Sequence, residues 1–507
     1  MGAGRAHFPL LISPFSDKPM SEEEIIALRK EKLARLREAG IDPYPPRFGR
    51  THTAAEAVEV LGEAAENATS VSVAGRITAM RGMGKASFLD LRDGSGRIQA
   101  YVKQENVGAH AYALLKDLDL GDFLGVTGTL FRTKTGEPTV DTREFTVLAK
   151  ALRPPPEKWH GVQDVEIRYR QRYLDLMANP EVREAFVTRS KIIACIRRFL
   201  DSRGYLEVET PVLQASAGGA AARPFVTHHN TLDRDFYLRI SLELHLKRLV
   251  VGGFDRVYEL GRIFRNEGAS TKYNPEFTML ELYEAYADYN RIMELVEEMV
   301  VTIADEVLGT RKVQNGDTVI DLTPPWPRIP IRQAIINRCG IDFEAIAEDA
   351  ALRRAAAESG VRVEDWWGRG KTIDEIFTLH VEPHLVQPAF IIDYPVELSP
   401  LAKRKPGDPR LVERFEFFIC GREGGNAYTE LNDPVDQRER MLQQAGLKAA
   451  GDEEAELADE DFLVALEHGM PPTGGLGIGI DRLVMALTGQ QSIREVILFP
   501  ALREREK

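Results

Sequence analysis

The stretch "FRNEGASTKYNPEFTMLELY", which runs from Phe264 to Tyr283, predicts two β-strands joined by a turn. Successive side chains of a strand point to opposite faces, so residues two apart share a face. Arg265 and Glu267 therefore share a face of the first strand. One face of the second strand is an ordinary core face, whereas the other carries a carboxylate and a phenol beside two large apolar groups. The core face holds Thr278, Leu280 and Leu282, and the mixed face holds Phe277, Met279, Glu281 and Tyr283. Charged groups are seldom buried without partners, so the mixed face indicates either a structural ion pair or a binding site.

Length and composition narrow the class of protein. A chain of 507 residues predicts about two or three domains. It is 43% hydrophobic and 28% charged, as soluble globular proteins are, and no apolar run reaches the roughly 18 residues of a membrane span. With a net charge of −13, nucleic acid would have to bind to local basic or aromatic patches. Cys195, Cys339 and Cys420 lie far apart without metal-type spacing, which fits a reducing cytoplasm and no zinc site.

The first 150 residues predict three segments. Residues 1–20 contain a short apolar patch broken by Pro9 and Pro14, and we expect a disordered extension rather than a secretory signal. Residues 21–68 form a helical segment, whose first helix opens with Ser21 and Glu24 at capping-box spacing and ends at Gly40. Residues 69–150 contain five short β-rich runs, which suit a small barrel of the oligonucleotide-binding (OB) type. Spacing alone leaves an SH3-like or other small barrel open.

The remaining chain predicts a linker and a larger domain. Residues 151–165 include the proline-rich "LRPPPEKWHG", which is typical of a linker. Residues 166–507 mix strands and helices without regular βαβ alternation. This pattern predicts an α+β domain with an antiparallel sheet flanked by helices, and residues 330–387 are richer in helix, as in an insertion.

A second informative stretch is "RFEFFICGREGGNAYTELND", residues 414–433. Asn426, Tyr428 and Glu430 share a strand face. Glu416 and Glu423 lie on either side of an expected turn, and two carboxylates without His or Cys suit Mg²⁺ better than zinc. Spacing alone favours the alternative, a pair of solvated turn glutamates.

A third stretch is "GGLGIGIDRLVMAL", residues 474–487. Alternating glycines allow another group to approach the strand backbone closely. Asp481 and Arg482 follow at the start of an apolar helix, where the arginine could hold a phosphate in charge-assisted hydrogen bonds. The alternative is a helix start with an ion pair, because a glycine-rich run alone is weak evidence.

Together these stretches resemble the motifs of class II aminoacyl-tRNA synthetases. The first stretch resembles the second motif of that class, "GREGGNAYTELND" its amino-acid-pocket strand, and "GLGIGIDRL" its third motif. "GYLEVETPVL" resembles the first motif, with Pro211 at the usual place of the dimer interface. Segments such as "GKASFLDLRDGSGRIQAYV" and "LELHLKRLVVGGFDRVYELGRIFRNEG" are similar to the bacterial-type lysyl-tRNA synthetases. The resemblance covers roughly residues 20–507 and implies an OB-type anticodon-binding barrel followed by a class II catalytic domain.

The resemblance also implies an activity. Such an enzyme, a cytoplasmic homodimer with no membrane partner, activates L-lysine with ATP to lysyl-adenylate and pyrophosphate, with Mg²⁺ as cofactor. It then transfers lysine to the 3′ end of tRNA(Lys). The positions implied to bind lysine are Glu243, Arg265, Glu281, Tyr283, Asn426, Tyr428, Glu430 and Gly477. Within that set, Glu281, Tyr283 and Glu430 would surround the ε-ammonium group, and Glu243 would bind the α-amino group.

Further roles follow from the same resemblance. The positions implied to bind ATP are Arg265, Glu267, Asn274, Phe277, Met279 and Arg482, of which Arg265 and Arg482 are the implied catalytic residues. Glu416 and Glu423 would hold Mg²⁺. The implied anticodon-binding positions are Arg81, Phe88, Gln99 and Glu137, although Phe88 could instead belong to the barrel core.

Three positions depart from the family pattern. Tyr273 stands where the family has a histidine near the ATP phosphates, "SLEL" replaces alanine-proline before Glu243, and Tyr428 stands where phenylalanine is common. We expect activity to survive these changes.

Three rival functions are less consistent with the sequence. An aspartyl- or asparaginyl-tRNA synthetase would not place the carboxylates of Glu281 and Glu430 around its substrate side chain. An enzyme that lysylates a protein would lack the barrel. A non-catalytic RNA-binding paralogue should have lost one or more of four residues, and all four are present: Arg265, Arg482, Glu416 and Glu423.

Overall fold

The computed structural model describes residues 20–64, 66–156, 162–216, 218–220, 222–449 and 459–503. The chain divides into two compact units, Met1–Gly161 and Val162–Lys507, and each is described by itself. The extension expected over residues 1–20 lies outside the described residues except for Met20. Within the described ranges, no helix combines the length and the apolarity needed to cross a membrane.

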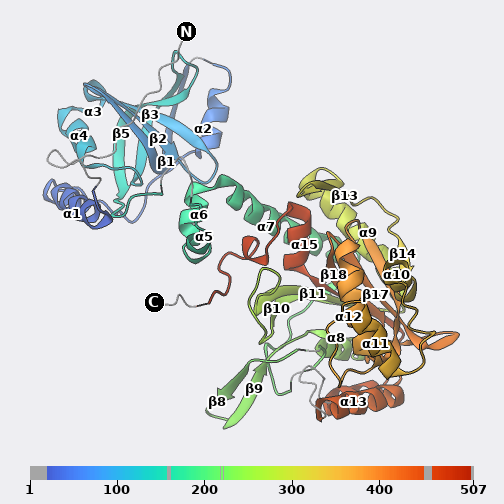
Figure 1. The fold of residues 1–507 in the computed structure, drawn as a ribbon. Helices are drawn as coiled ribbons and strands as arrows, with labels where there is room; N and C mark the ends of the chain where they lie inside the picture. Colours follow the sequence, from blue (N-terminus) through green and yellow to red (C-terminus); the bar gives the residue numbers. More distant parts are fainter. Residues whose placement is uncertain are drawn as a thin grey trace. The chain divides into compact units, whose positions relative to one another are not determined.

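Five strands of the first unit close into a barrel (Figure 1). They are β1 (Glu66–Met83), β2 (Ala86–Arg92), β3 (Arg97–Lys103), β4 (Phe123–Arg132) and β5 (Pro138–Ala149), in the order β1-β2-β3-β5-β4. Alternate residues such as Leu89, Leu91 and Ile98 fill the interior. The predicted five-stranded OB-type barrel is therefore confirmed.

Short helices surround this barrel. They are α1 (Glu22–Glu38), α2 (Ala54–Leu61), α3 (Gln104–Val107) and α4 (Ala109–Ala113). The helix α1 begins as predicted at a capping box, in which Glu24 N donates to Ser21 Oγ (3.2 Å) and Ser21 N donates to Glu24 Oε2 (2.7 Å). The helix α2 packs Ala57 and Leu61 against the barrel core.

A nine-stranded sheet forms the centre of the second unit. Its strands are β6 (Leu206–Glu207), β10 (Arg256–Phe264), β11 (Glu276–Ala285), β14 (Arg328–Pro330), β15 (Ala389–Pro395), β16 (Arg404–Lys405), β17 (Asp408–Ile419), β18 (Arg422–Thr429) and β19 (Thr473–Gly479). The order is β14-β15-β17-β18-β19-β11-β10-β6, with β16 beside β17. The sheet is antiparallel from β15 to β10, as predicted, but β14 and β6 pair parallel to their neighbours and make its two ends mixed. Parallel pairs need long crossovers, and in each case a long segment separates the two strands.

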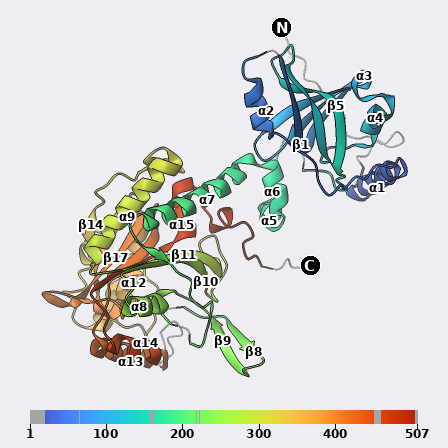
Figure 2. The ribbon, with the colours of Figure 1, turned by 180° about the vertical axis from the view of Figure 1, so that it is seen from behind.

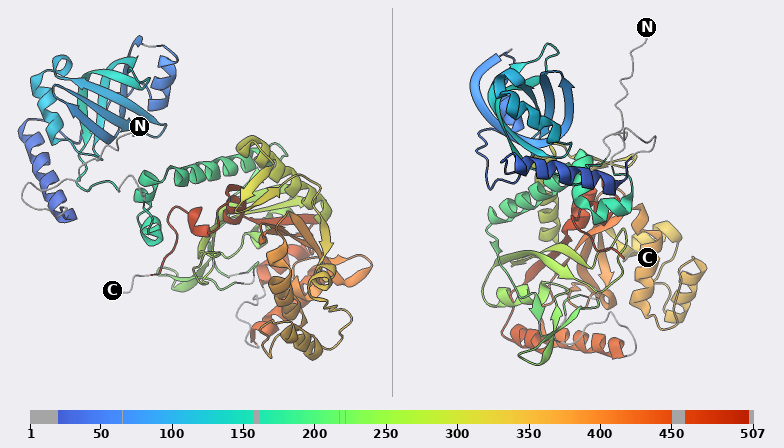
Figure 3. Two further views of the ribbon diagram at one scale, coloured as in Figure 1. Left: turned by 45° about the horizontal axis from the view of Figure 1, so that its top comes forward. Right: turned by 90° about the vertical axis from the view of Figure 1, so that its left-hand side faces the viewer.

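Helices cover the two faces of this sheet differently. One face packs on α7 (Pro180–Asp201), α9 (Tyr289–Ile303) and α15 (Ile480–Thr488), against strand residues such as Leu280 and Leu282 (Figures 1 and 3). On the other face, α8 (Glu243–Val251) and α14 (Glu460–Glu467) pack over β10 and β11. The helices α10 (Ile331–Cys339), α11 (Asp349–Glu358) and α12 (Arg369–His380) pack over β15 and β17. Between these two groups, β11, β18 and β19 line a cavity.

Smaller elements complete the second unit. The helices α5 (Val165–Arg170) and α6 (Arg172–Ala178) precede α7, and α13 (Pro434–Ala449) follows β18. The strands β7 (Leu213–Gln214), β8 (Val226–His229) and β9 (Arg234–Leu238) form a small separate sheet, of which β8 and β9 are visible in Figure 2. The strands β12 (Lys312–Asn315) and β13 (Thr318–Asp321) pair with each other.

One strand prediction was wrong. β10 ends at Phe264 and β11 begins at Glu276, so Arg265 and Glu267 lie in the connecting loop and not on a strand face. In this loop Arg265 N donates to the carbonyl of Pro275 (2.9 Å), which closes the loop on itself after it leaves the sheet.

Candidate active site

The cavity over the open part of the sheet has a volume of about 870 Å³. Of the residues implied to bind lysine, ATP or Mg²⁺, all but Glu416 line its wall. They are Glu243, Arg265, Glu267, Asn274, Phe277, Met279, Glu281, Tyr283, Glu423, Asn426, Tyr428, Glu430, Gly477 and Arg482. A cavity of this size with a few polar groups converging on it is typical of a small-molecule site.

Strand alternation explains how these residues meet. The mixed face of β11 lines the cavity with Phe277, Met279, Glu281 and Tyr283, as the sequence predicted, while Leu280 points into the opposite core. Glu281 pairs with Gly477 of β19, and Gly477 pairs with Asn426 of β18. Three neighbouring strands therefore contribute groups to one wall.

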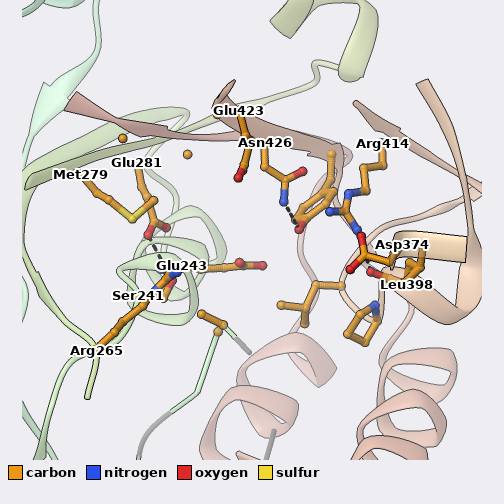
Figure 4. A pocket seen from close by; sticks show the side chains of 18 of the residues that line it. Ser241, Glu243, Arg265, Met279, Glu281, Asp374, Leu398, Arg414, Glu423 and Asn426 are labelled. Atoms are coloured by element: carbon orange, nitrogen blue, oxygen red, sulfur yellow. Dashed lines mark hydrogen bonds between the residues drawn. The ribbon is translucent and has the colours of Figure 1, made fainter. Parts of the chain in front are cut away.

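The end of the cavity beside α8 is acidic. Glu281 Oε1 accepts hydrogen bonds from Ser241 Oγ (3.1 Å) and from the backbone N–H of Leu242 (2.9 Å). The Tyr283 hydroxyl donates to Glu281 Oε2 at 3.4 Å. Figure 4 shows the Glu243 side chain extending into the cavity on the same side as Glu281. These contacts fix the direction of the Glu281 carboxylate toward the cavity.

Burial changes the titration of this end. Burial, and then the charge of Glu243, raises the pKa of Glu281 to about 7. Burial likewise raises the pKa of Glu430 above its usual range. Its Oε2 forms an ion pair with Nζ of Lys247, and among the described residues no hydrogen-bond partner is found for its Oε1. A buried carboxylate whose hydrogen-bonding capacity is only partly used favours a cationic ligand.

Asn426 also has a buried polar atom that lacks a hydrogen-bond partner among the described residues. Asn426 Nδ2 donates to the Tyr428 hydroxyl at 2.6 Å, whereas Asn426 Oδ1 is buried without a hydrogen-bond partner in the part of the chain described here. The oxygen is an additional acceptor for a ligand that carries N–H groups.

Two arginines, Arg265 and Arg482, also line the cavity, and Arg265 lies beside Ser241 (Figure 4). Arg265 donates through Nε to the carbonyl of Ile240 (3.4 Å), and its guanidinium lies 5.3 Å from the centroid of the Phe277 ring. Within the described ranges no carboxylate forms an ion pair with Arg265, so the rest of its fork can bind an anion. Arg482 Nη1 pairs with Glu423 Oε2 at 2.9 Å, and its guanidinium lies 5.8 Å from the Tyr273 ring.

The Asn274 side chain, which the resemblance implies to bind ATP, already forms two hydrogen bonds within the chain. Its Nδ2 donates to the carbonyl of Glu276, and its Oδ1 accepts from the backbone N–H of Ala501 at 3.0 Å. Its side chain therefore holds two segments of the chain together, although the residue lines the cavity.

The two implied metal ligands lie on neighbouring strands, where Glu416 pairs with Asn426 and Glu423 with Phe418, and the Glu423 side chain is the more exposed. Glu416 accepts from the Tyr394 hydroxyl (2.9 Å) and pairs with Arg414. Burial raises its pKa, and the negative charge of Glu423 raises it further, although Arg414 opposes them. In the described ranges no group of three or more acidic, His or Cys side chains could hold a metal by itself. A pair of carboxylates is still the protein share that Mg²⁺ commonly uses when substrate phosphates complete its shell, so the residues fit this ion.

The residues implied to bind the anticodon lie on one outer face of the barrel. Arg81 pairs in register with Phe88, and Phe88 with Tyr101, whose ring stacks on Phe88 at 4.4 Å between centroids. Phe88 is half-buried and lies outside the barrel core, so the core alternative is wrong. Tyr101 was missed, although its place two residues after Gln99 was a visible signal.

A polar network extends the same face. Gln99 Nε2 donates to Asp90 Oδ1 (3.3 Å), Arg81 pairs with that oxygen (3.0 Å), and Arg97 pairs with Asp90 and Glu137. Stacked aromatics beside charged and amide groups are the features that bind unpaired bases.

Pro211 lies apart from the cavity and is exposed. The next two residues, Val212 and Leu213, are apolar and also exposed. Three consecutive exposed apolar side chains are uncommon on a surface that contacts only water.

Comparisons with known proteins agree with this geometry. Residues 164–503 match the family described as tRNA synthetases class II (D, K and N), and residues 71–151 match the OB-fold nucleic acid binding domain. A curated lysine–tRNA ligase of Moorella thermoacetica is 58% identical over 96% of this chain and 99% of its own length. Lysine–tRNA ligases of Pelotomaculum thermopropionicum (57% identical, over 95% of this chain and 96% of the relative) and Bacillus subtilis (54%, over 97% and 100%) are also similar.

Proposed function

Because the chain belongs to the lysine–tRNA ligases, a family of class II aminoacyl-tRNA synthetases, we propose that its cavity is the site where lysine and ATP react. The chain is an enzyme that attaches lysine to tRNA. The proposal assigns this reaction to particular residues. The observation that carries it is a cavity whose lining includes the carboxylates of Glu243, Glu281 and Glu430 together with the arginines Arg265 and Arg482.

We assign the acidic end to the amino acid. Glu281, Tyr283 and Glu430 surround the ε-ammonium group, and Glu243 binds the α-amino group. Asn426, Tyr428 and Gly477 complete the pocket. An ammonium group that leaves water needs carboxylates as partners, and a neutral side chain such as that of leucine would leave these carboxylates unpaired. A site of this kind rejects such an analogue by roughly 10⁴-fold or more.

We assign the part of the cavity lined by Phe277, Arg265 and Arg482 to ATP. Phe277 stacks on adenine, with Glu267, Asn274 and Met279 beside it. Arg265 holds the α-phosphate together with the lysine carboxylate, and Arg482 holds the γ-phosphate. The planar fork of arginine matches both groups.

The first step then needs positioning more than proton transfer. A lysine carboxylate oxygen attacks the α-phosphorus, the new O–P bond forms, and the bond to pyrophosphate breaks with its electron pair leaving on pyrophosphate. No proton moves, so Arg265 and Arg482 contribute by orienting the reactants and by neutralising charge. Mg²⁺, held by Glu416 and Glu423 with the phosphates, adds positive charge at the leaving group when bound.

The second step uses tRNA(Lys). The hydroxyl of its 3′-terminal ribose attacks the carbonyl carbon of lysyl-adenylate and forms an ester bond. The bond from that carbon to the phosphate oxygen breaks, AMP leaves with the electron pair, and the hydroxyl proton is released to water. We assign recognition of the anticodon to the barrel face with Arg81, Phe88, Gln99 and Glu137. Because this reaction supplies translation, we place it in the cytoplasm.

We further propose that the chain acts as a homodimer. The exposed apolar residues Val212 and Leu213, which directly follow Pro211, support an interface at this position. Sedimentation of the purified chain should give the mass of two copies, and Pro211→Asp should shift it toward one copy.

The direct test of the proposal is charging of tRNA. The purified chain with ATP, Mg²⁺ and radiolabelled lysine should produce acid-precipitable lysyl-tRNA, and Arg265→Ala should abolish this product while the thermal melting temperature stays close to that of the parent. Full charging by Arg265→Ala would refute the assigned role of this arginine.

A further inference from the structure

A buried lysine of the chain itself, Lys247, lies behind the acidic end of the cavity. It stands one helical turn after Glu243 on α8, and its side chain has no exposed surface. Its Nζ is 2.6 Å from Glu243 Oε1 and forms an ion pair with Glu430 Oε2, while Phe462 of α14 covers it from behind. Lys247 is not among the residues that line the cavity. It can therefore affect a bound ligand only through the two carboxylates.

The charges at this end can be counted. Glu243, Glu281 and Glu430 line the cavity, and Lys247 compensates one of their three negative charges. Two negative charges remain, which equals the number of ammonium groups of a diamino acid. Arg265 also lines the cavity and matches the carboxylate of that ligand. Since buried charges are tolerated only when paired, the filled pocket is balanced for a diamino acid and unbalanced for a monoamino acid.

The position of Glu430 also depends on Lys247. On its other side the carboxylate is pressed against β19, because a Cβ at Gly475 would lie 2.0 Å from Glu430 Oε1. Among the described residues, Lys247 is the one group that pairs with this carboxylate, and Oε1 has no hydrogen-bond partner. The ion pair with Lys247 is therefore the contact that keeps this carboxylate in place and favours its charged form.

We propose that Lys247 is a positioning residue that sets the amino-acid pocket at two uncompensated negative charges and thereby selects a diamino acid. This inference rests on the proposed function, because it takes the acidic end to be the lysine pocket. Lys247 does not touch the substrate and acts through Glu430 and Glu243.

Several other groups face Glu430 and influence its charge. From α8 these are Lys247 and Glu243, from β11 Glu281 and Tyr283, from β18 Tyr428, and beyond Tyr428 the cation Arg414. Burial raises the pKa of Glu430 and Lys247 lowers it, so loss of the Lys247 charge strengthens the hold of Glu430 on its proton. That proton must leave when an ammonium group binds.

The test compares the dissociation constants of L-lysine and ATP for the full chain and two variants by calorimetry between pH 6.5 and 9. Lys247→Met removes the charge, and Lys247→Gln removes the charge but keeps hydrogen-bond donors. The Gln variant allows the same measurement if the Met variant does not fold. Both should bind lysine at least about tenfold more weakly at pH 7, since each unit of raised pKa costs about tenfold. The loss should shrink as the pH rises, and ATP affinity should stay constant.

A matched control lies next to Lys247 on the same helix. Arg248 pairs with Asp459 at 2.9 Å and not with the pocket, so Arg248→Met should leave lysine affinity unchanged. In a Glu430→Gln background, Lys247→Met should weaken lysine binding less than in the parent chain, because the two residues act together.

Unchanged lysine affinity in both Lys247 variants, an equal loss at every pH, or additive losses in the double variant would each overturn the inference. Failure of the parent chain to bind lysine at any pH would instead refute the proposed function.

Discussion

The glycines of β19 give a graded prediction for the amino-acid pocket. A Cβ at Gly475 would lie 2.0 Å from Glu430 Oε1 and 2.5 Å from Tyr283 Cε1. Both side chains are buried, and Lys247 prevents Glu430 from moving away from β19. Gly475→Ala must therefore move the Glu430 carboxylate into the space that the substrate ammonium group occupies. Overpacking of this kind costs about 1–3 kcal/mol, which corresponds to a roughly 5- to 150-fold loss in kcat/KM for lysine.

Two other glycines on the same strand serve as controls. A Cβ at Gly477 would meet the flexible end of Met279 at 3.3 Å, and a Cβ at Gly479 would meet Arg482 Cδ at an ordinary 3.8 Å. Lysine-dependent ATP–pyrophosphate exchange should therefore fall most in Gly475→Ala, less in Gly477→Ala and least in Gly479→Ala. The KM for ATP should change by less than about twofold in Gly475→Ala, since its added methyl group would meet Glu430 and Tyr283, which are assigned to lysine. Equal values of kcat/KM for lysine in Gly475→Ala and Gly479→Ala would refute the reasoning.

Three further predictions concern other parts of the chain. Glu281→Gln keeps an acceptor for Ser241 and Leu242 but loses the charge that faces the ammonium group. The kcat/KM for lysine should therefore fall by roughly 10- to 150-fold while ATP binding persists. An equal loss of lysine use and ATP binding would contradict the assignment. Because the pKa of Glu281 is raised to about 7, its carboxyl group must lose its proton when lysine binds. The affinity for lysine should therefore rise by up to about tenfold per pH unit between pH 6 and 8. A lysine affinity that falls with increasing pH in calorimetry would contradict this prediction. Phe88→Ala removes a ring that stacks on Tyr101 in the barrel. The rate of tRNA charging should fall by roughly 5- to 150-fold, whereas ATP–pyrophosphate exchange without tRNA should stay unchanged. Loss of this exchange would show that the ring is needed for more than tRNA binding.

Local sequence patterns predicted those parts of the fold that local physics decides. Strand alternation placed Glu281 and Tyr283 on one face and Leu280 on the other, and the structure agrees, because a strand with one buried face has a fixed register. The capping box at Ser21 was also visible, since all its partners lie within one turn.

Features that depend on tertiary contacts were not visible. Arg265 and Glu267 follow the alternation of a strand, but the chain leaves the sheet at this point and the pattern carries no sign of it. The parallel strands β6 and β14 depend on crossovers whose paths a local pattern does not contain. Glu416 was expected as a metal ligand from the family resemblance, whereas its contacts to Arg414 and Tyr394 come only from the folded sheet.

The acidic pocket shows the same division. Lys247 follows Glu243 at the spacing of an ion pair on a helix, and that signal was readable. Its contact with Glu430 joins segments far apart in the chain, and only the fold brings them together.

The central claim is that the acidic end of the cavity binds the side chain of lysine for activation by ATP. ATP–pyrophosphate exchange, measured without tRNA and in parallel with lysine, aspartate, asparagine and β-lysine, tests it most directly. The account predicts exchange with lysine and none with aspartate or asparagine. Exchange with aspartate or asparagine, or no exchange with any of the four amino acids, would contradict it.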